Sequence, residues 1–351
     1  MSEDVWSAQD TSPGEIEAAL RGLLRERHAE SEGFVPARVL NLIVILDREW
    51  RGEIANRLER VGRYHASRTV LCCVERGRET LDAHAAMRFE DDALPGAMAV
   101  LVEQVEIDVG PEHLERLDTI VDPVLVADLP VLVWAPHGHP EGVDALLKLA
   151  NVVLLDSVEE PELDGALARV ASLSEQAYVV DLAWLRSTPW RERLSATFDP
   201  PARRGGLRQI SAITVRHQPE STVAALLLVG WLASRLGWKP EALIRRNGSL
   251  HGRATGRRQD VEVRLEGQAD QGVPGLAGVT VELASGESFS LDRGPGGLAA
   301  AWQGRDGKER RWTVLGASRG EGGILGEGVR QALLRDPTYT PAIEAARAML
   351  P

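Results

Sequence analysis

The chain has 351 residues, of which 44% are hydrophobic and 26% charged, and its formal net charge is −12. A chain of this length is long for one hydrophobic core, and its composition is ordinary for folded proteins, so we expect two globular domains and exclude wholesale disorder. An acidic chain disfavours nonspecific nucleic-acid binding, because contacts to the phosphate backbone need lysine and arginine.

The charge is divided unevenly along the chain. Residues 1–198 carry 19 basic and 36 acidic side chains, whereas residues 199–351 carry 21 basic and 16 acidic ones. This asymmetry indicates either that the halves face different partners or each other, or that their solvated surfaces simply differ in charge.

Cysteine usage and hydropathy predict a soluble protein of the cytoplasm. The two cysteines, Cys72 and Cys73, are adjacent and cannot form a framework of long-range disulfides. The N-terminus, Met1–Asp4, lacks the apolar core of a secretory signal. The longest apolar run, Val223–Ala233, has 11 residues, against about 20 for a membrane-spanning helix.

Strands and helices are predicted to alternate in the first half. Branched and apolar runs predict strands at 39–46, 69–74, 97–107, 131–134 and 152–155, and helical periodicity predicts helices at 15–28, 49–62, 142–149 and 160–176. This order is typical of a parallel α/β sheet. We expect a Rossmann-like α/β layer domain over residues 37–200, with an antiparallel excursion near 80–108, preceded by an N-terminal helix and arm over residues 1–36.

The segment 180–198 is the most informative part of the sequence. It places two tryptophans and three arginines within ten residues, Trp184–Arg193. These two residue types carry much of the energy of protein–protein contacts, so the segment indicates binding rather than catalysis. Thr188 and Pro189 predict a helix start with Thr188 as its cap. Trp190 then shares a face with Leu194 and Phe198, so it also fits a core position.

The second half has a different pattern. A linker is predicted at 202–206, a strand at 207–216 and an almost wholly apolar helix at 222–238. Short alternating runs around 261–265, 279–283, 289–291 and 312–314, separated by glycine-containing turns, predict an antiparallel meander. Helices are predicted at 324–334 and 340–350. We expect a C-terminal α+β domain over residues 207–351.

No recognisable catalytic residues, cofactor fingerprint or metal-ligand cluster stands out. Cys72 and Cys73 fit two inert core thiols, and His137 and His139 lack a third metal ligand nearby. The glycine-rich loop around Gly316, Arg319 and Gly320 more closely fits a tight connection than a phosphate-binding turn, but a sugar-phosphate or nucleotide site there stays open. The residues after the first strand contain no glycine to admit a pyrophosphate.

Several segments, taken together, carry a family resemblance. They are Arg38–Leu42, residues 65–70, Asp128–Val131 with Trp134, the motif Asp181–Arg191, and Ala224–Trp238. In this order they resemble the glucose-6-phosphate dehydrogenase assembly protein family, OpcA, and the Asp181–Arg191 motif is the most specific of them.

The resemblance implies a non-enzymatic effector with no cofactor, which binds glucose-6-phosphate dehydrogenase, favours its active oligomer and supports NADPH supply by the oxidative pentose phosphate pathway. The expected contact residues are Trp184, Arg186, Trp190, Arg191, Arg68 and Trp134. The alternative is an enzyme or sensor that binds a sugar phosphate or nucleotide through the basic C-terminal domain.

Overall fold

The computed structural model describes residues 2–30, 38–62, 66–89, 101–315, 320–332 and 334–351. The chain divides into two compact units. The first unit comprises residues 1–155, 173–180 and 325–334, and the second comprises residues 156–172, 181–324 and 335–351.

The first unit is built on an eight-stranded sheet with the order β1-β4-β5-β3-β2-β6-β7-β8. Its strands are β1 (Ser2–Ala8), β2 (Leu40–Asp47), β3 (Ser67–Val74), β4 (Asp82–Phe89), β5 (Leu101–Val109), β6 (Val131–Trp134), β7 (Val152–Leu155) and β8 (Tyr178–Asp181). The strands β5, β3, β2, β6 and β7 run parallel, and β4 and β1 add to the β5 edge in antiparallel fashion. The predicted Rossmann-like sheet and its antiparallel excursion are therefore confirmed.

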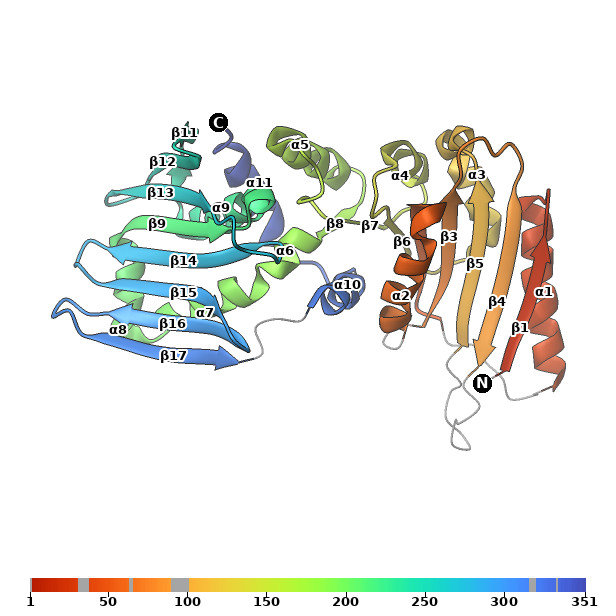
Figure 1. Cartoon of the computed structure of the whole chain (residues 1–351), viewed down its shortest axis with the longest axis horizontal. Helices are drawn as coiled ribbons and strands as arrows, with labels where there is room; N and C mark the ends of the chain where they lie inside the picture. The colour runs from red at the N-terminus through yellow and green to blue at the C-terminus, as the bar shows by residue number, and fades with distance from the viewer. Residues whose placement is uncertain (1, 31–37, 63–65, 90–100, 316–319, 333) are drawn as a thin grey trace. The chain divides into compact units, whose positions relative to one another are not determined.

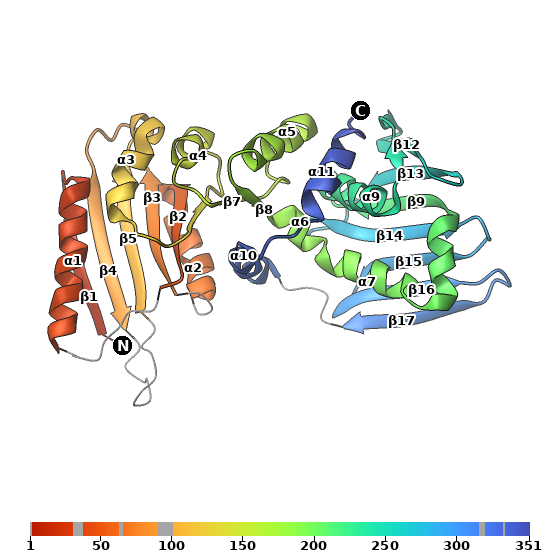
Figure 2. The same cartoon turned by 180° about the vertical axis from the view of Figure 1, so that it is seen from behind.

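Helices cover both faces of this sheet. They are α1 (Pro13–Glu30), α2 (Arg51–Gly62), α3 (Leu117–Val121) and α4 (Pro140–Leu146), with 3₁₀ turns η1 (Arg48–Trp50), η2 (Pro111–Arg116) and η3 (Asp122–Val124). Figure 1 shows α2 over one face, and Figure 2 shows α1 and α3 over the other. Because both faces are covered, β2 and β3 are continuous apolar runs whose central residues, such as Val44 and Leu71, are fully buried. Residues 2–30, the expected N-terminal helix and arm, supply β1 and α1.

The second unit contains a nine-stranded sheet with the order β10-β12-β13-β9-β14-β15-β16-β17, in which β11 also pairs with β12. Its strands are β9 (Ile210–His217), β10 (Lys239–Pro240), β11 (Ile244–Arg246), β12 (Ser249–Thr255), β13 (Asp260–Gly267), β14 (Leu276–Leu283), β15 (Ser288–Gly294), β16 (Gly297–Gln303) and β17 (Glu309–Leu315). Strands β14 to β17 form the predicted antiparallel meander, and only β13 and β9 pair in parallel.

One face of this sheet is apolar and the other polar. Val263, Val215, Val279 and Leu291 lie on the apolar side and are fully buried. Helices α7 (Thr188–Phe198), α9 (Thr222–Leu236) and α11 (Tyr339–Arg347) cover that side, as Figure 2 shows. The remaining helical segments are α5 (Leu163–Ser174), α6 (Leu182–Arg186), α8 (Pro201–Arg204), η4 (Gly205–Gln209), η5 (Pro219–Ser221) and α10 (Gly320–Gln331). No helix in the described ranges is long and apolar enough to cross a membrane.

Some local predictions were wrong. Thr188 is already inside α7, and the preceding Ser187 takes the cap position without a side-chain cap bond. The predicted linker at 202–206 is instead occupied by α8 and η4. Strands β1, β8, β10, β11, β12 and β16 were not predicted, because their sequences lack a strong alternating or apolar pattern and they depend on neighbouring strands for their stability.

Gly230 lets α9 and α11 approach closely. A Cβ atom at this position would lie 2.2 Å from the backbone oxygen of Ala342. A backbone oxygen held in a helix cannot move aside as a flexible side chain can, so the glycine is required by the packing of α9 against α11.

We predict that Gly230→Ala destabilises the protein by about 1–3 kcal/mol, because overpacking forces the two helices apart. Thermal unfolding followed by circular dichroism measures the effect. Gly22→Ala in α1 is the matched control, since a Cβ there meets nothing within 4 Å and alanine favours a helix by about 0.5–1 kcal/mol. Equal melting of the Gly230→Ala and wild-type proteins would contradict this account of the packing.

Candidate functional site

The first place to seek a site is the carboxyl edge of the parallel sheet between β2 and β6. The strand order reverses there, and open α/β sheets bind ligands at that point. At this edge Asp47 ends β2 and Trp50 follows it, and His137 and His139 follow β6. The rings of Trp50 and His137 lie 5.4 Å apart between centroids. Nε2 of His139 lies 3.2 Å from Oδ1 of Asp47.

These side chains leave no phosphate-binding turn. The segment from Asp47 to Gly52 reads DREWRG, and its first five residues all carry side chains larger than glycine. A dinucleotide needs glycine here so that its pyrophosphate can approach the backbone and the helix N-terminus. Burial lowers the pKa of His137, so its imidazole is neutral at pH 7 and adds no positive charge. The residues at this edge therefore do not fit a nicotinamide dinucleotide.

A cysteine and two carboxylates meet nearby, at the ends of β3 and β5. Cys73, Glu106 and Asp108 present ligand atoms within 4.8 Å of one another. Both carboxylates are already engaged, because Arg48 forms an ion pair with Asp108 and Arg51 forms one with Glu106. Burial raises the pKa of Cys73 to about 12, and the two acidic neighbours contribute to the rise. A thiol in this state is a poor metal ligand, so the cluster fits an ion-pair network better than a metal centre.

The Asp181–Arg191 motif forms a buried network in the second unit. The Asp181 carboxylate is 1% exposed. It accepts hydrogen bonds from the hydroxyls of Ser157 and Tyr339, both at 2.7 Å, and from the backbone nitrogens of Ser157 and Ala183. Burial and the nearby Asp156 raise the pKa of Asp181, while the bonds from Ser157 and Tyr339 oppose that rise. The carboxylate thus joins three separate segments of the chain.

Trp184 and Arg191 meet at Asp336. The Trp184 indole nitrogen donates to Oδ2 of Asp336 at 2.9 Å, and the Arg191 guanidinium lies 3.4 Å from the same oxygen. The guanidinium carbon of Arg191 also sits 3.5 Å above the Trp184 ring. Burial lowers the pKa of Arg191 to about 10, so it stays charged at pH 7. This stack holds α6 and α7 against the segment that precedes α11.

The six residues expected to contact a partner are all largely buried. Trp134, Trp184 and Trp190 are each 2% exposed, and Arg68 and Arg191 are 7% and 8% exposed. Arg68 donates to the buried Glu103 and to the carbonyl of Val124. Arg186 pairs with Asp156 at 2.6 Å. Each arginine has an acidic partner within its own unit, so these side chains are not accessible to another protein in this conformation, and a contact role for them remains a prediction.

The predicted anion-binding loop cannot be assessed in the same way. Gly316 and Arg319 lie outside the described residues, and Gly320 is the first residue of α10.

Sequence reasoning missed a pocket on the apolar face of the second sheet. It has a volume of about 420 Å³ and lies between α7, α8 and strands β15 to β17. Its polar lining comes from Arg193, Arg203 and Arg310, and its aromatic lining from Phe289 and Trp312. Arg310 lies more than 100 residues after Arg193 and Arg203, so no local motif marks the pocket. The sequence offered two weaker signals of it: the alternation that puts Arg310 and Trp312 on one side of a strand, and the net positive charge of this half of the chain.

We predict that Asp336→Asn destabilises the protein by about 1–3 kcal/mol at pH 7, because the variant loses a charge-assisted contact to Arg191 and Trp184. Burial raises the pKa of Asp336, but bonds from Thr338 and Trp184 and the charge of Arg191 outweigh it, so the net shift is downward. Ionised Asp336 therefore stabilises the fold above its unfolded pKa, and this contribution is lost as pH falls through the folded value. Denaturant unfolding of both proteins should differ at pH 7 and converge as the pH falls below the folded pKa of Asp336. A difference independent of pH would contradict the role of the charge.

The cysteines provide a second prediction. Cys72 and Cys73 are both fully buried, and burial raises the pKa of each thiol. A chromogenic aromatic disulfide at about pH 8 should therefore leave the native protein unmodified, since only an accessible thiolate attacks it. The same reagent should titrate both thiols in denaturant. Rapid reaction of the native protein would instead show that one strand end opens to solvent.

Comparisons with known proteins find two matching family models. One is described as the N-terminal domain of a glucose-6-phosphate dehydrogenase subunit and matches residues 58–172, and the other is described as the C-terminal domain of that subunit and matches residues 177–343. An oxidoreductase structure from Bacillus subtilis aligns with 88% of this chain and 95% of its own, at 13% identity and a TM-score of 0.48. A second oxidoreductase structure aligns with 88% of this chain and 94% of its own, at 13% identity and a TM-score of 0.47.

Curated relatives carry the name OxPP cycle protein OpcA. The protein of Synechococcus elongatus is 29% identical over 174 residues, which are 48% of this chain and 39% of the relative. That of Nostoc punctiforme is 31% identical over 193 residues, which are 52% of this chain and 41% of the relative. The chain thus aligns with about four tenths of the length of these relatives. With both domain models matched in order, the chain belongs to the OpcA family.

Proposed function

We propose that this chain is a non-enzymatic assembly factor that binds glucose-6-phosphate dehydrogenase and favours its active oligomer in the oxidative pentose phosphate pathway. The observation that carries the proposal is the match of two successive segments, residues 58–172 and 177–343, to models described as domains of a glucose-6-phosphate dehydrogenase subunit. The relatives named for the OxPP cycle support the same pathway.

The residues at the carboxyl edge of the first sheet support the non-enzymatic part of the proposal. An oxidoreductase on this topology would place its nicotinamide dinucleotide at the reversal point between β2 and β6. Here the tilted rings of Trp50 and His137 lie against each other, and Asp47 pairs with His139 at that point. The sheet then serves as a rigid support for surfaces that meet another protein.

Activation by such a factor requires that its affinity for the active oligomer differ from its affinity for the resting form. A protein that binds the active oligomer more tightly than the resting form shifts the population toward it, by as much as the two binding free energies differ. A tenfold preference corresponds to about 1.4 kcal/mol. Within this proposal, Trp184 and Arg191 act by keeping α6 and α7 fixed, because ordering a surface in advance lowers the entropy lost on binding.

We predict that adding this chain to glucose-6-phosphate dehydrogenase from the same organism raises the rate of NADPH formation or lowers the apparent KM for the sugar phosphate. The effect should saturate as binding sites fill. The rate is followed by NADPH absorbance over a range of sugar-phosphate concentrations, and a sizing column run at the same protein ratio reports the change in oligomer.

Two controls make the test specific. An unrelated acidic protein at equal concentration should leave the rate unchanged, and the chain alone should form no NADPH. If the chain neither changes the kinetics nor co-migrates with the dehydrogenase, the proposed partner is wrong. If the chain alone forms NADPH from the sugar phosphate, the non-enzymatic assignment is wrong.

A further inference from the structure

The arginine-lined pocket of the second unit lies where three elements converge. Helix α7 supplies Arg193 and Thr197, helix α8 supplies Arg203, and strand β17 supplies Arg310 and Trp312. Its volume of about 420 Å³ falls within the range of small-molecule sites, about 300–1,000 Å³. The pocket is formed within a single unit, so its shape does not depend on where the other unit lies.

The pocket carries positive charge without compensation. Its lining contains three arginines and neither aspartate nor glutamate. Among the described residues, none of the three arginines forms an ion pair with a carboxylate. Nε of Arg193 is buried and has no hydrogen-bond partner in the described structure. A buried guanidinium nitrogen without an acceptor is costly, so the site favours an anion that brings acceptor oxygens.

Two aromatic rings, Phe289 and Trp312, stand among the uncharged residues of the lining. Phe289 and Trp312 stack with ring centroids 6.0 Å apart, and Trp302 lies 6.2 Å from Phe289. The guanidinium carbon of Arg203 sits 4.6 Å above the Trp302 ring, which orients this cation at the pocket wall. Trp312 is 38% exposed, so part of its indole is free to contact a ligand. Exposed aromatic faces stack on rings and on the apolar faces of sugars.

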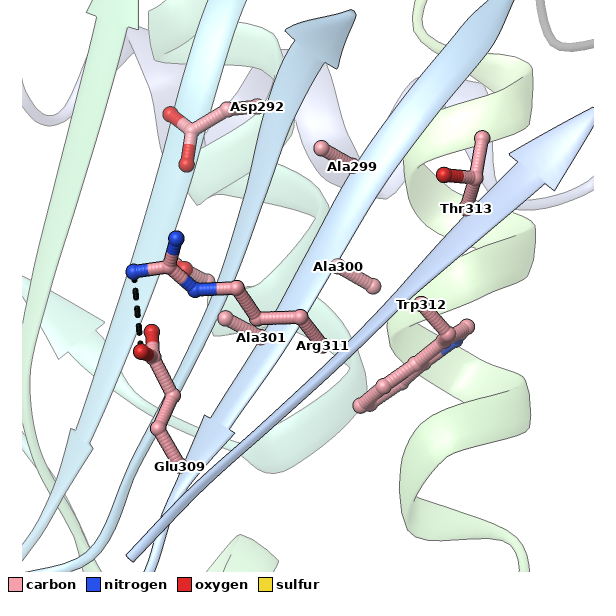
Figure 3. Close-up of a pocket in the computed structure, with 9 residues that line it drawn as sticks. Asp292, Ala299, Ala300, Ala301, Glu309, Arg311, Trp312 and Thr313 are labelled. Carbon is pink, nitrogen blue, oxygen red and sulfur yellow. Dashed lines mark ion pairs between the residues drawn. The ribbon is translucent and has the colours of Figure 1, made fainter. Parts of the chain in front are cut away.

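The opposite face of the same strands differs in its chemistry. Figure 3 shows that face, where a hollow of about 480 Å³ is lined by Asp292, Glu309 and Arg311 among others. There Arg311 pairs with Glu309 at 2.8 Å, while Trp312, which also borders this hollow, extends from the other side of the strand. Positive and negative groups therefore balance on the polar face. Of the two pockets compared, the one beside Arg310 and Trp312 is lined by arginines and by no aspartate or glutamate.

We propose that this pocket binds an organic phosphate, a phosphate monoester attached to a ring. The phosphate oxygens would accept from the guanidinium groups of Arg193 and Arg310, since arginine forks match phosphate geometry. The ring would lie against the exposed indole of Trp312. The inference concerns the chain alone and does not depend on a dehydrogenase partner, so either proposal can fail without the other.

Isothermal titration of the full chain tests the inference, with glucose 6-phosphate and AMP as probes. Glucose, adenosine and inorganic phosphate serve as the separated parts. We expect saturable binding of at least one ester, at least tenfold tighter than that of inorganic phosphate, and no binding of glucose or adenosine. Arg310→Gln should weaken binding of the ester about tenfold or more, because the variant loses a charged donor to the phosphate oxygens.

Adjacent residues of β17 supply the matched control. Arg311→Gln removes the same charge from the polar face and should leave ester binding within about twofold of wild type at physiological salt, where screening limits distant charges. Equal weakening by both substitutions would overturn the site, since it would report only the overall charge. Binding of inorganic phosphate as tight as that of the esters would overturn the ring contact. Failure of both esters, with binding of an acidic peptide instead, would assign the pocket to a protein partner.

Discussion

The contact of Asp336 with Trp184 and Arg191 sets the geometry on which the second unit depends. It joins α6 and α7 to a segment about 150 residues later in the chain, with Arg191 stacked on the indole and both donors directed at one carboxylate oxygen. Helix α7 is thereby fixed over the apolar face of the sheet. The position of Arg193, one turn or less from Arg191 on the same helix, follows from this anchor.

The same network explains why a segment rich in tryptophan and arginine is buried. Tryptophan and arginine are common at interfaces because they combine large apolar area with strong donors. The same properties suit an internal junction, provided that acceptors are supplied. Asp156 pairs with Arg186, and Asp336 accepts from Trp184 and Arg191. A motif of this kind can therefore identify a family through its architecture, without lying on its binding surface.

The first unit shows how a nucleotide-binding topology can be retained without its phosphate site. The strand order and the parallel register around β2 are those of a dinucleotide-binding sheet. The turn after β2 carries Trp50, whose ring lies against His137, and Arg48 and Arg51 are committed to Asp108 and Glu106. In the part of the chain that the structure describes, arginines without an acidic partner line a pocket of the second unit instead, namely Arg193, Arg203 and Arg310.

The sequence by itself determined the classes of both units and most of their elements. The strand at 40–47 and the helix at 222–236 can be recognised from the sequence. An element that is buried on most sides needs a mostly apolar run of residues, and both segments have one. A series of segments in order, of which Asp181–Arg191 is the most specific, was enough to suggest the family. What the sequence could not decide was which side chains are exposed. Tertiary structure placed Asp336 against Trp184 and brought Arg193, Arg203 and Arg310 into one pocket. These relations join residues distant in sequence, and no local periodicity encodes contacts between elements that meet only after folding.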